Sequence, residues 1–140
     1  MDFKYELTVV PVSDVDLAKE FYADKLGFKV DVDHSAGDVF RVVQLTPPGS
    51  AASITIGKGM PQAEPGSYTG MHLVVEDLPA ARDLLVERGV EVGEPFHFGA
   101  EGPAGGLHPE RLSYGSFASF SDPDGNAWLI QEVTERSPGR

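Results

Sequence analysis

The side chains of this 140-residue chain that could do chemistry are mainly histidines and carboxylates. Cysteine is absent, which excludes thiol nucleophiles, disulfides and thiolate metal sites. A histidine near neutral pH can act as an acid, a base or a metal ligand. His72 lies in an apolar run and is a candidate acid or base, or else a structural residue that bonds a neighbour. His97 and His108 lie in a Gly- and Pro-rich loop together with Glu101 and Glu110, and these side chains could join His72 in an unusual metal site.

Two aspartates, Asp122 and Asp124, look like a pair of catalytic carboxylates. They lie, however, in the sequence Asp-Pro-Asp-Gly-Asn at 122–126, where Asp and Asn side chains typically bond their own backbone. We therefore predict that both aspartates are structural. The sequence contains neither a phosphate-binding Gly-rich loop nor a Gly-x-Ser-x-Gly nucleophile turn, so the sequence gives no support for these two kinds of site.

The composition narrows the class of partner. A formal net charge of -11 argues against nucleic acid, whose phosphates require clustered Lys and Arg. No apolar run approaches the roughly 20 residues that cross a bilayer, and no basic-then-apolar leader is present. We therefore expect a cytoplasmic protein with neither a nucleic acid nor a membrane as its partner.

An internal repeat indicates which elements position the candidate side chains. Residues 12–18, Val-Ser-Asp-Val-Asp-Leu-Ala, correspond to residues 75–81, Val-Glu-Asp-Leu-Pro-Ala-Ala. Each copy predicts a strand and then an amphipathic helix that ends at a glycine, Gly27 or Gly89. Ser13 or Asp14 is predicted to be the N-cap of the first helix, and Pro79 to begin the second. A repeat of this length indicates one supersecondary unit that is used twice.

Further strands follow each predicted helix, so the chain is an α+β protein. The Gly- and Pro-rich segment 57–70 is predicted to link the two copies. Segment 96–109 is too rich in Gly and Pro for regular structure and is predicted to be a loop, either a lid over a binding site or a mobile excursion. The predicted strands are 6–12, 41–45, 53–56, 71–75, 116–120 and 127–131. The aromatic residues predicted for the core are Phe21, Tyr22, Phe28, Phe120 and Trp128.

Three sequence patterns together resemble the vicinal oxygen chelate superfamily. They are Pro-Val-Ser-Asp at 11–14, Phe-Tyr…Leu-Gly-Phe at 21–28 and Asp-Pro-Asp-Gly-Asn at 122–126. That superfamily includes glyoxalase I, bleomycin-resistance proteins, extradiol dioxygenases and fosfomycin-resistance enzymes. The resemblance implies one domain, 1–135, of two βαβββ modules with pseudo-twofold symmetry, whose curled sheets surround a shared cleft. Module 1 would span about 1–59 and module 2 about 70–135, with 136–140 as a tail. Because members often pair, a homodimer is expected.

The resemblance also implies where a metal would bind. Metal-using members carry His or Gln on the first strand of each module and Glu on the last strand. The matching positions of this chain hold Leu7, Thr55, Gly70 and Leu129. These residues do not make a usable ligand set for a divalent cation. We therefore expect no metal site and no cofactor, unless a displaced metal site exists.

The family fold also implies which strand residues face the cleft. Most of them are apolar, with Thr55, His72 and Gln131 as hydrogen-bonding groups, as is typical of small-molecule pockets. We predict a small-molecule-binding protein of the glyoxalase/bleomycin-resistance type, with its ligand in an apolar cleft. The alternative is an enzyme of the same superfamily, an isomerase, lyase or dioxygenase, that uses a displaced metal or His72 as acid or base. The predicted ligand-binding residues are Leu7, Val9, Thr55, His72, Val74, Phe98, Tyr114, Phe117, Leu129 and Gln131, and Phe96 is also expected to reach a ligand.

Overall fold

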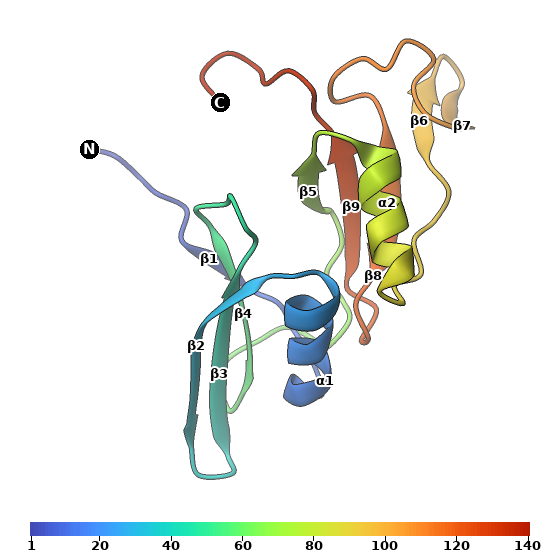
Figure 1. Cartoon of the computed structure of the whole chain (residues 1–140). Coiled ribbons are helices and arrows are strands. Elements are labelled where there is room, and N and C mark those ends of the chain that lie inside the picture. Colours follow the sequence, from blue (N-terminus) through green and yellow to red (C-terminus); the bar gives the residue numbers. More distant parts are fainter. The chain divides into compact units, whose positions relative to one another are not determined.

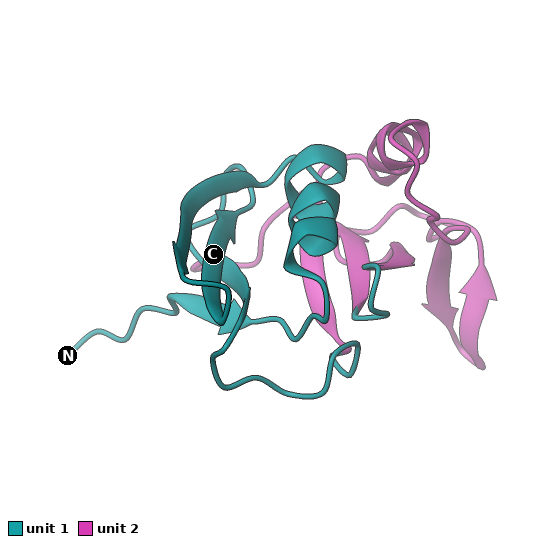
Figure 2. Cartoon of the chain, turned by 90° about the horizontal axis from the view of Figure 1, so that it is seen from below, with its two compact units in different colours: residues 1–68, 122–126 teal, residues 69–121, 127–140 magenta.

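The structure is a computed structural model that describes residues 1–140 (Figure 1). The chain divides into two compact units, which Figure 2 shows in different colours. Unit 1 consists of residues 1–68 and the turn 122–126, and unit 2 consists of residues 69–121 and 127–140. The turn 122–126 therefore belongs to a different unit from the two strands that it joins. The structure contains no helix that is both long and apolar enough to cross a membrane.

Unit 1 is a four-stranded sheet with one helical segment. Its strands lie in the order β1-β4-β3-β2, with β1 parallel to β4 and the other neighbours antiparallel. In chain order the elements are β1 (Leu7–Val9), α1 (Val15–Lys19), a π-helix η1 (Glu20–Lys25), β2 (Lys29–Ala36), β3 (Phe40–Thr46) and β4 (Ser53–Lys58). The strands predicted at 41–45 and 53–56 are confirmed. The first strand is shorter than the predicted 6–12. Beyond Val10, the backbone N–H of Val12 donates to the side chain of Gln62 (3.1 Å) instead of to β4.

Unit 2 is a five-stranded sheet with one helix. Its strands lie in the order β5-β9-β8-β6-β7, with β5 parallel to β9 and the other neighbours antiparallel. In chain order the elements are β5 (Met71–Val75), α2 (Leu78–Glu87), β6 (Phe96–Gly99), β7 (Gly102–Gly105), β8 (Phe117–Ser121) and β9 (Ala127–Glu132). The strands predicted at 71–75, 116–120 and 127–131 are confirmed to within one residue.

The prediction that segment 96–109 has no regular structure was wrong. Most of it forms an antiparallel hairpin of β6 and β7, so unit 2 has one strand more than the predicted βαβββ module. Strand β7 lies at the edge of the sheet, where Pro103 can sit opposite Phe98 although it has no N–H to donate to a further strand. Gly102 begins β7 with a φ of 105°, a conformation that glycine adopts at little cost.

The helix ends follow the local signals of the repeat. Asp14 accepts a hydrogen bond from the backbone N–H of Leu17 (3.0 Å), and Asp77 accepts one from Ala80 (3.0 Å). Asp14 is therefore the N-cap of α1, which decides between the two predicted candidates Ser13 and Asp14, and Asp77 is the N-cap of α2.

Buried apolar residues form the core of each unit. In unit 1, Val43 lies opposite Ile56 and Leu45 opposite Ile54, so these four buried side chains share one face of the sheet. The five aromatic residues predicted for the core are confirmed, since each is at most 6% exposed: Phe21, Tyr22, Phe28, Phe120 and Trp128.

The turn 122–126 is held within unit 1 by hydrogen bonds. The carboxylate of Asp122 accepts from the backbone N–H groups of Asp124 (3.0 Å) and Asn126 (2.9 Å), and from the hydroxyl of Tyr22 (2.7 Å). The carboxylate of Asp124 accepts from the hydroxyl of Ser13 (2.6 Å). The predicted structural role of both aspartates is thus confirmed.

Candidate ligand-binding faces

One face of the unit 2 sheet collects six of the predicted ligand-binding residues, five of which lie on β5, β8 and β9. Side chains that lie opposite one another in the register share a face of a sheet. His72 lies opposite Leu129, and Val74 lies opposite Gln131. Gln131 in turn lies opposite Phe117. Because residues two apart on a strand point the same way, all five lie on one face.

Four aromatic rings form a cluster on this face. Phe96 lies opposite Phe117, and their rings stack with centroids 5.6 Å apart. The rings of Phe98 and His72 lie nearly perpendicular to that of Phe117, with centroids at 5.4 Å and 6.5 Å. Phe117 is buried, whereas Phe98 is 57% exposed. We call these four residues the aromatic face.

Two polar side chains on the same face offer hydrogen-bond acceptors. The Nδ1 atom of His72 lies 2.9 Å from the carbonyl oxygen of Gly70. Because a carbonyl only accepts, a neutral His72 ring carries its proton on Nδ1 and leaves Nε2 as an acceptor. The Nε2 atom of Gln131 donates to the carbonyl oxygen of Tyr114 (3.0 Å), which leaves its Oε1 as an acceptor. Both side chains are thus oriented by the backbone.

Tyr114 differs from the other predicted site residues, because its side chain is held by the C-terminal segment. Its hydroxyl oxygen accepts a hydrogen bond from the backbone N–H of Ser137 (2.9 Å), and hydrogen bonding with Ser137 lowers the pKa of Tyr114. Its backbone N–H donates to the carbonyl oxygen of Glu132 (2.8 Å). A contact between Tyr114 and a ligand stays a prediction.

In unit 1 the other three predicted ligand-binding residues share a sheet face. Leu7 lies opposite Ser53, and Val9 lies opposite Thr55. Thr55 also lies opposite Gln44 on its other side. Ser53 and Thr55 are buried, and the hydroxyl of Thr55 has no hydrogen-bond partner. Gln44 and Ser53 therefore belong to this face, although the sequence did not single them out.

The histidines of segment 96–109 do not join His72. His97 alternates with Phe96 and Phe98 along β6, so it lies on the opposite face of the sheet from His72. The rings of His97 and His108 instead contact each other, with centroids 5.9 Å apart. No three His, Asp or Glu side chains form a group that could hold a metal ion.

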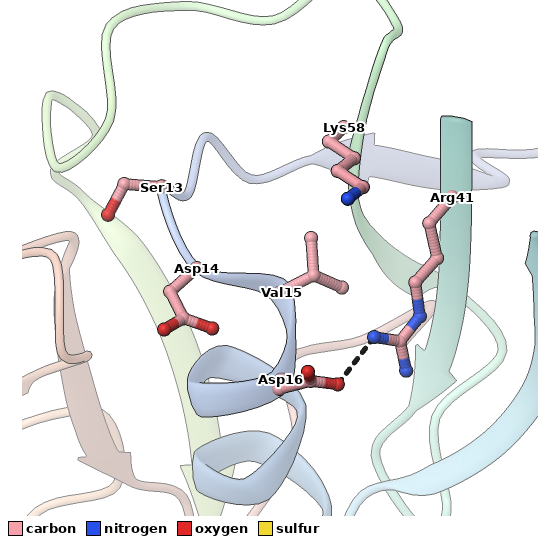
Figure 3. A pocket seen from close by; sticks show the side chains of 6 residues that line it. All are labelled: Ser13, Asp14, Val15, Asp16, Arg41 and Lys58. Atoms are coloured by element: carbon pink, nitrogen blue, oxygen red, sulfur yellow. Dashed lines mark hydrogen bonds and ion pairs between the residues drawn. The ribbon is translucent and has the colours of Figure 1, made fainter. Parts of the chain in front are cut away.

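A pocket of about 220 Å³ in unit 1 lies beside α1 and is shown in Figure 3. None of the predicted ligand-binding residues lines it. Asp14 caps α1, and Asp16 forms an ion pair with Arg41, so the two carboxylates of the pocket are already engaged. The lining residues are Ser13, Asp14, Val15, Asp16, Arg41 and Lys58.

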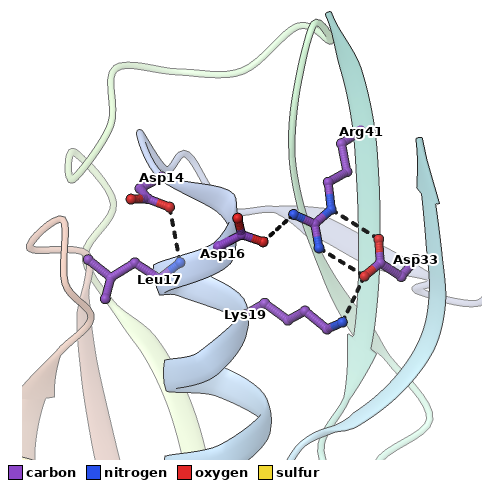
Figure 4. A network of polar contacts seen from close by, with 6 residues as sticks. All are labelled: Asp14, Asp16, Leu17, Lys19, Asp33 and Arg41. Atoms are coloured by element: carbon purple, nitrogen blue, oxygen red, sulfur yellow. Dashed lines mark hydrogen bonds and ion pairs between the residues drawn. The ribbon is translucent and has the colours of Figure 1, made fainter. Parts of the chain in front are cut away.

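Arg41 is the centre of an ion-pair network that joins α1, β2 and β3 (Figure 4). It donates to Asp33 from Nε (3.0 Å) and from Nη2 (2.9 Å), and it also donates to Asp16. Lys19 donates to Asp33 as well (2.7 Å). The hydrogen bonds from Arg41 and then from Lys19 hold the pKa of Asp33 well below its usual range.

The substitution Arg41→Met is expected to lower the free energy of unfolding by about 1 kcal/mol at neutral pH, because partly exposed ion pairs contribute little more. Since the pKa of Asp33 is lower in the folded than in the unfolded chain, this stabilisation is present above the usual carboxylate range and is lost as the pH falls through the folded value. Urea unfolding between neutral and strongly acidic pH measures both effects. Lys58→Met is the control, since Lys58 lines the same pocket without an ion pair. If the loss of unfolding free energy in Arg41→Met changed with neither pH nor salt, the ion pairs of Arg41 would not be its cause.

The chain matches known proteins over most of its length. The model of the Glyoxalase/Bleomycin resistance protein/Dioxygenase superfamily matches residues 4–130. The uncharacterized protein YetH of Bacillus subtilis (strain 168) is 27% identical over 125 residues, which cover 88% of this chain and 92% of YetH.

Two solved structures from Streptomyces sp. CB03234 share the fold. A glyoxalase/bleomycin resistance protein is 32% identical with a TM-score of 0.69, covering 92% of this chain and 100% of the other. TnmS3, an antibiotic binding protein, is 32% identical with a TM-score of 0.72, covering 94% of this chain and 97% of TnmS3. The resemblance and the fold class predicted from the sequence are thus confirmed. This chain belongs to the glyoxalase/bleomycin resistance protein/dioxygenase superfamily.

Proposed function

We propose that the chain binds a small planar organic molecule on the aromatic face and holds it without a metal ion. The observation that carries the proposal is the ring cluster, in which buried Phe117 supports the exposed ring of Phe98. An exposed aromatic ring favours stacking or edge contacts with another planar ring. An apolar surface with a few oriented polar groups is also typical of small-molecule sites.

The polar groups of the same face indicate what else the ligand carries. Nε2 of His72 and Oε1 of Gln131 are both acceptors, because their partner atoms already donate to backbone carbonyls. We therefore propose a ligand with at least one hydroxyl or N–H group beside its ring. The 32% identity with TnmS3, an antibiotic binding protein, supports a small organic molecule as the class of ligand.

The proposal that no metal takes part rests on the side chains at the ligand positions of metal-using members. Leu7, Gly70 and Leu129 have no donor atom in their side chains, and Thr55 has one hydroxyl. Divalent cations in proteins are held by several carboxylate, imidazole or thiolate groups. We therefore expect ligand binding to be unchanged after treatment with a chelator.

Naphthol is expected to bind more tightly than its saturated counterpart decahydronaphthol, because only a planar ring stacks on the aromatic face. The substitution Phe98→Ala should weaken naphthol binding about tenfold, since it removes an aromatic contact together with its buried area. NMR titration of isotope-labelled protein measures the affinity and locates the contact. Leu112→Ala is the control, because Leu112 is an exposed apolar residue of unit 2 outside the aromatic face. Equal binding of the two compounds, or binding that a chelator abolishes, would refute the proposal.

An enzyme of the same superfamily is a second candidate function, and one observation favours it. The hydrogen bond from Nδ1 of His72 to Gly70 leaves Nε2 unprotonated in the neutral ring, where it could accept a proton from a ligand. His72→Gln keeps a polar side chain but cannot transfer a proton. Conversion of a bound compound by the wild type, lost in His72→Gln while binding persists, would identify the enzyme. Binding without conversion would favour the first function.

A further inference from the structure

We infer that unit 1 carries a separate polar subsite, formed by Gln44 and Thr55, that takes a carboxamide group of a ligand. This inference goes beyond the proposed function, because it concerns unit 1 alone and a different chemical group. Its basis is a run of hydrogen bonds across β2, β3 and β4 that ends at two unused polar atoms.

The hydrogen bonds of this run all point in one direction. The hydroxyl of Thr46 donates to the carboxylate of Asp31, which can only accept. Because the single hydrogen of Thr46 is then used, the contact between Thr46 and Ser53 (2.6 Å) requires the hydroxyl of Ser53 to donate. Ser53 can therefore only accept from Gln44, whose Nε2 lies 3.3 Å away.

A β-bulge fixes the acceptor end of the run. The pairing of β2 with β3 shifts between Val30 and Val32, so Asp31 has no residue directly opposite it. Bulges re-aim side chains out of the regular alternation, and Asp31 here reaches the hydroxyl of Thr46. Because the carboxylate of Asp31 can only accept, it fixes the direction of the hydroxyl groups of Thr46 and Ser53. The hydroxyl of Ser53 in turn orients the side-chain amide of Gln44.

Two polar atoms remain unused at that other end. Since Nε2 of Gln44 faces Ser53, the Oε1 atom of Gln44 is left as an acceptor. Thr55 lies directly opposite Gln44 and is only 5% exposed, and its hydroxyl has no hydrogen-bond partner. Buried polar groups without a partner are rare in folded proteins. The hydroxyl of Thr55 therefore indicates a hydrogen-bonding group that comes from outside the chain.

A carboxamide supplies what these two atoms lack. Its N–H donates to Oε1 of Gln44, and its carbonyl oxygen accepts from the hydroxyl of Thr55. A methyl ketone of the same shape has no donor for Gln44, and a carboxylate lacks the donor and adds a charge. Leu7 and Val9 lie beside Thr55 on the same face, so an aliphatic substituent on the carboxamide would meet apolar side chains.

Cyclohexanecarboxamide is the probe that tests this subsite, with cyclohexyl methyl ketone and cyclohexanecarboxylate as matched controls. In an NMR titration of the wild type, the carboxamide is expected to shift the side-chain amide signals of Gln44, and the two controls are not. Thr55→Val keeps the shape but removes the hydroxyl, and should weaken carboxamide binding about tenfold, whereas Thr55→Ser should retain it. Thr8→Val is the matched control variant, because Thr8 lies opposite Ile54 on the other face of the sheet.

Equal binding of the carboxamide and the ketone, or undiminished binding to Thr55→Val, would overturn the subsite. The proposed function would survive that result, because naphthol binding and its loss in Phe98→Ala do not involve Thr55. The wild-type titration also requires no variant to fold. A further readout needs no ligand: removal of an unpartnered buried hydroxyl should raise the urea midpoint of Thr55→Val above that of the wild type. A lower midpoint would show that the hydroxyl already has a partner within the chain.

Discussion

The substitution Arg111→Met is expected to lower the free energy of unfolding more than the other ion-pair substitution, Arg41→Met, because it leaves a fully buried carboxylate without its charged partner. Glu132, at the end of β9, is fully buried. Arg111 donates to both of its carboxylate oxygens, from Nε at 2.8 Å and from Nη2 at 2.6 Å. Only the backbone N–H of Leu78, which donates at 2.9 Å, would remain to compensate the charge. Urea unfolding at neutral pH measures the loss.

The pH dependence of this loss gives a sharper test. The hydrogen bonds from Arg111 lower the pKa of Glu132 in the wild type. The stabilisation is therefore present above the pKa of an unfolded glutamate and is lost as the pH falls through the folded value. In Arg111→Met, burial without the guanidinium is expected to raise the pKa of Glu132, so protonation should relieve the cost of the unpaired charge. The difference between the two proteins should shrink on acidification.

Two further variants separate the buried charge from simple loss of packing. Glu132→Gln in the Arg111→Met background removes the charge and should restore part of the lost stability. Arg136→Met should change the free energy of unfolding by less than about 0.5 kcal/mol, since Arg136 is exposed and forms no ion pair. A loss in Arg111→Met no larger than that of Arg136→Met would contradict the importance of the ion pair between Arg111 and the buried Glu132.

Asn126→Ala is expected to lower the free energy of unfolding by about 2–4 kcal/mol, because it removes three side-chain hydrogen bonds at a fully buried position. The side-chain nitrogen of Asn126 donates to the carbonyl of Pro11 (2.8 Å) and to the carboxylate of Asp122 (2.8 Å). Its side-chain oxygen accepts from the backbone N–H of Tyr68 (3.1 Å). Alanine can replace none of these hydrogen bonds. Urea unfolding measures the change.

The effect of Asn126→Ala should reach both units, since the turn 122–126 packs within unit 1 while β8 and β9 belong to unit 2. Hydrogen exchange measured residue by residue should show protection falling in β4 and in β9 alike. Ser121→Ala, at an exposed position beside the same turn, serves as the control. Loss of protection in unit 1 alone would mean that the turn does not couple the units.

The parts of the fold that the sequence predicted correctly depend on local signals. Asp14 and Asp77 are recognisable as caps because a short carboxylate before a helix reaches the N–H three residues on. Alternation along β9 likewise places Leu129 and Gln131 on one face, whatever the rest of the chain does. Of the aromatic face, His72 and Phe117 therefore lie on strands that the sequence predicts, whereas Phe96 and Phe98 lie on β6, which the sequence did not predict.

The features that the sequence missed depend on pairing between distant strands. Strand β2 is long, but most of its side chains are exposed, so no apolar alternation indicates it. The hairpin of β6 and β7 was missed because an edge strand tolerates Gly and Pro. Gln44 and Ser53 form no recognisable motif, since only the register of β3 and β4 brings them together. The bulge that orients them lies on a third strand.

Because the turn 122–126 belongs to unit 1, the first half of the chain cannot complete its fold while the ribosome is still making the second half. The hydroxyl of Tyr22 and the carbonyl of Pro11 meet their buried partners only after residue 126 has been synthesised. A fragment that stops at residue 68 would contain every strand and helix of unit 1 and would still lack this turn. Such a fragment should need the turn as an added peptide, in the way that split proteins are complemented in trans.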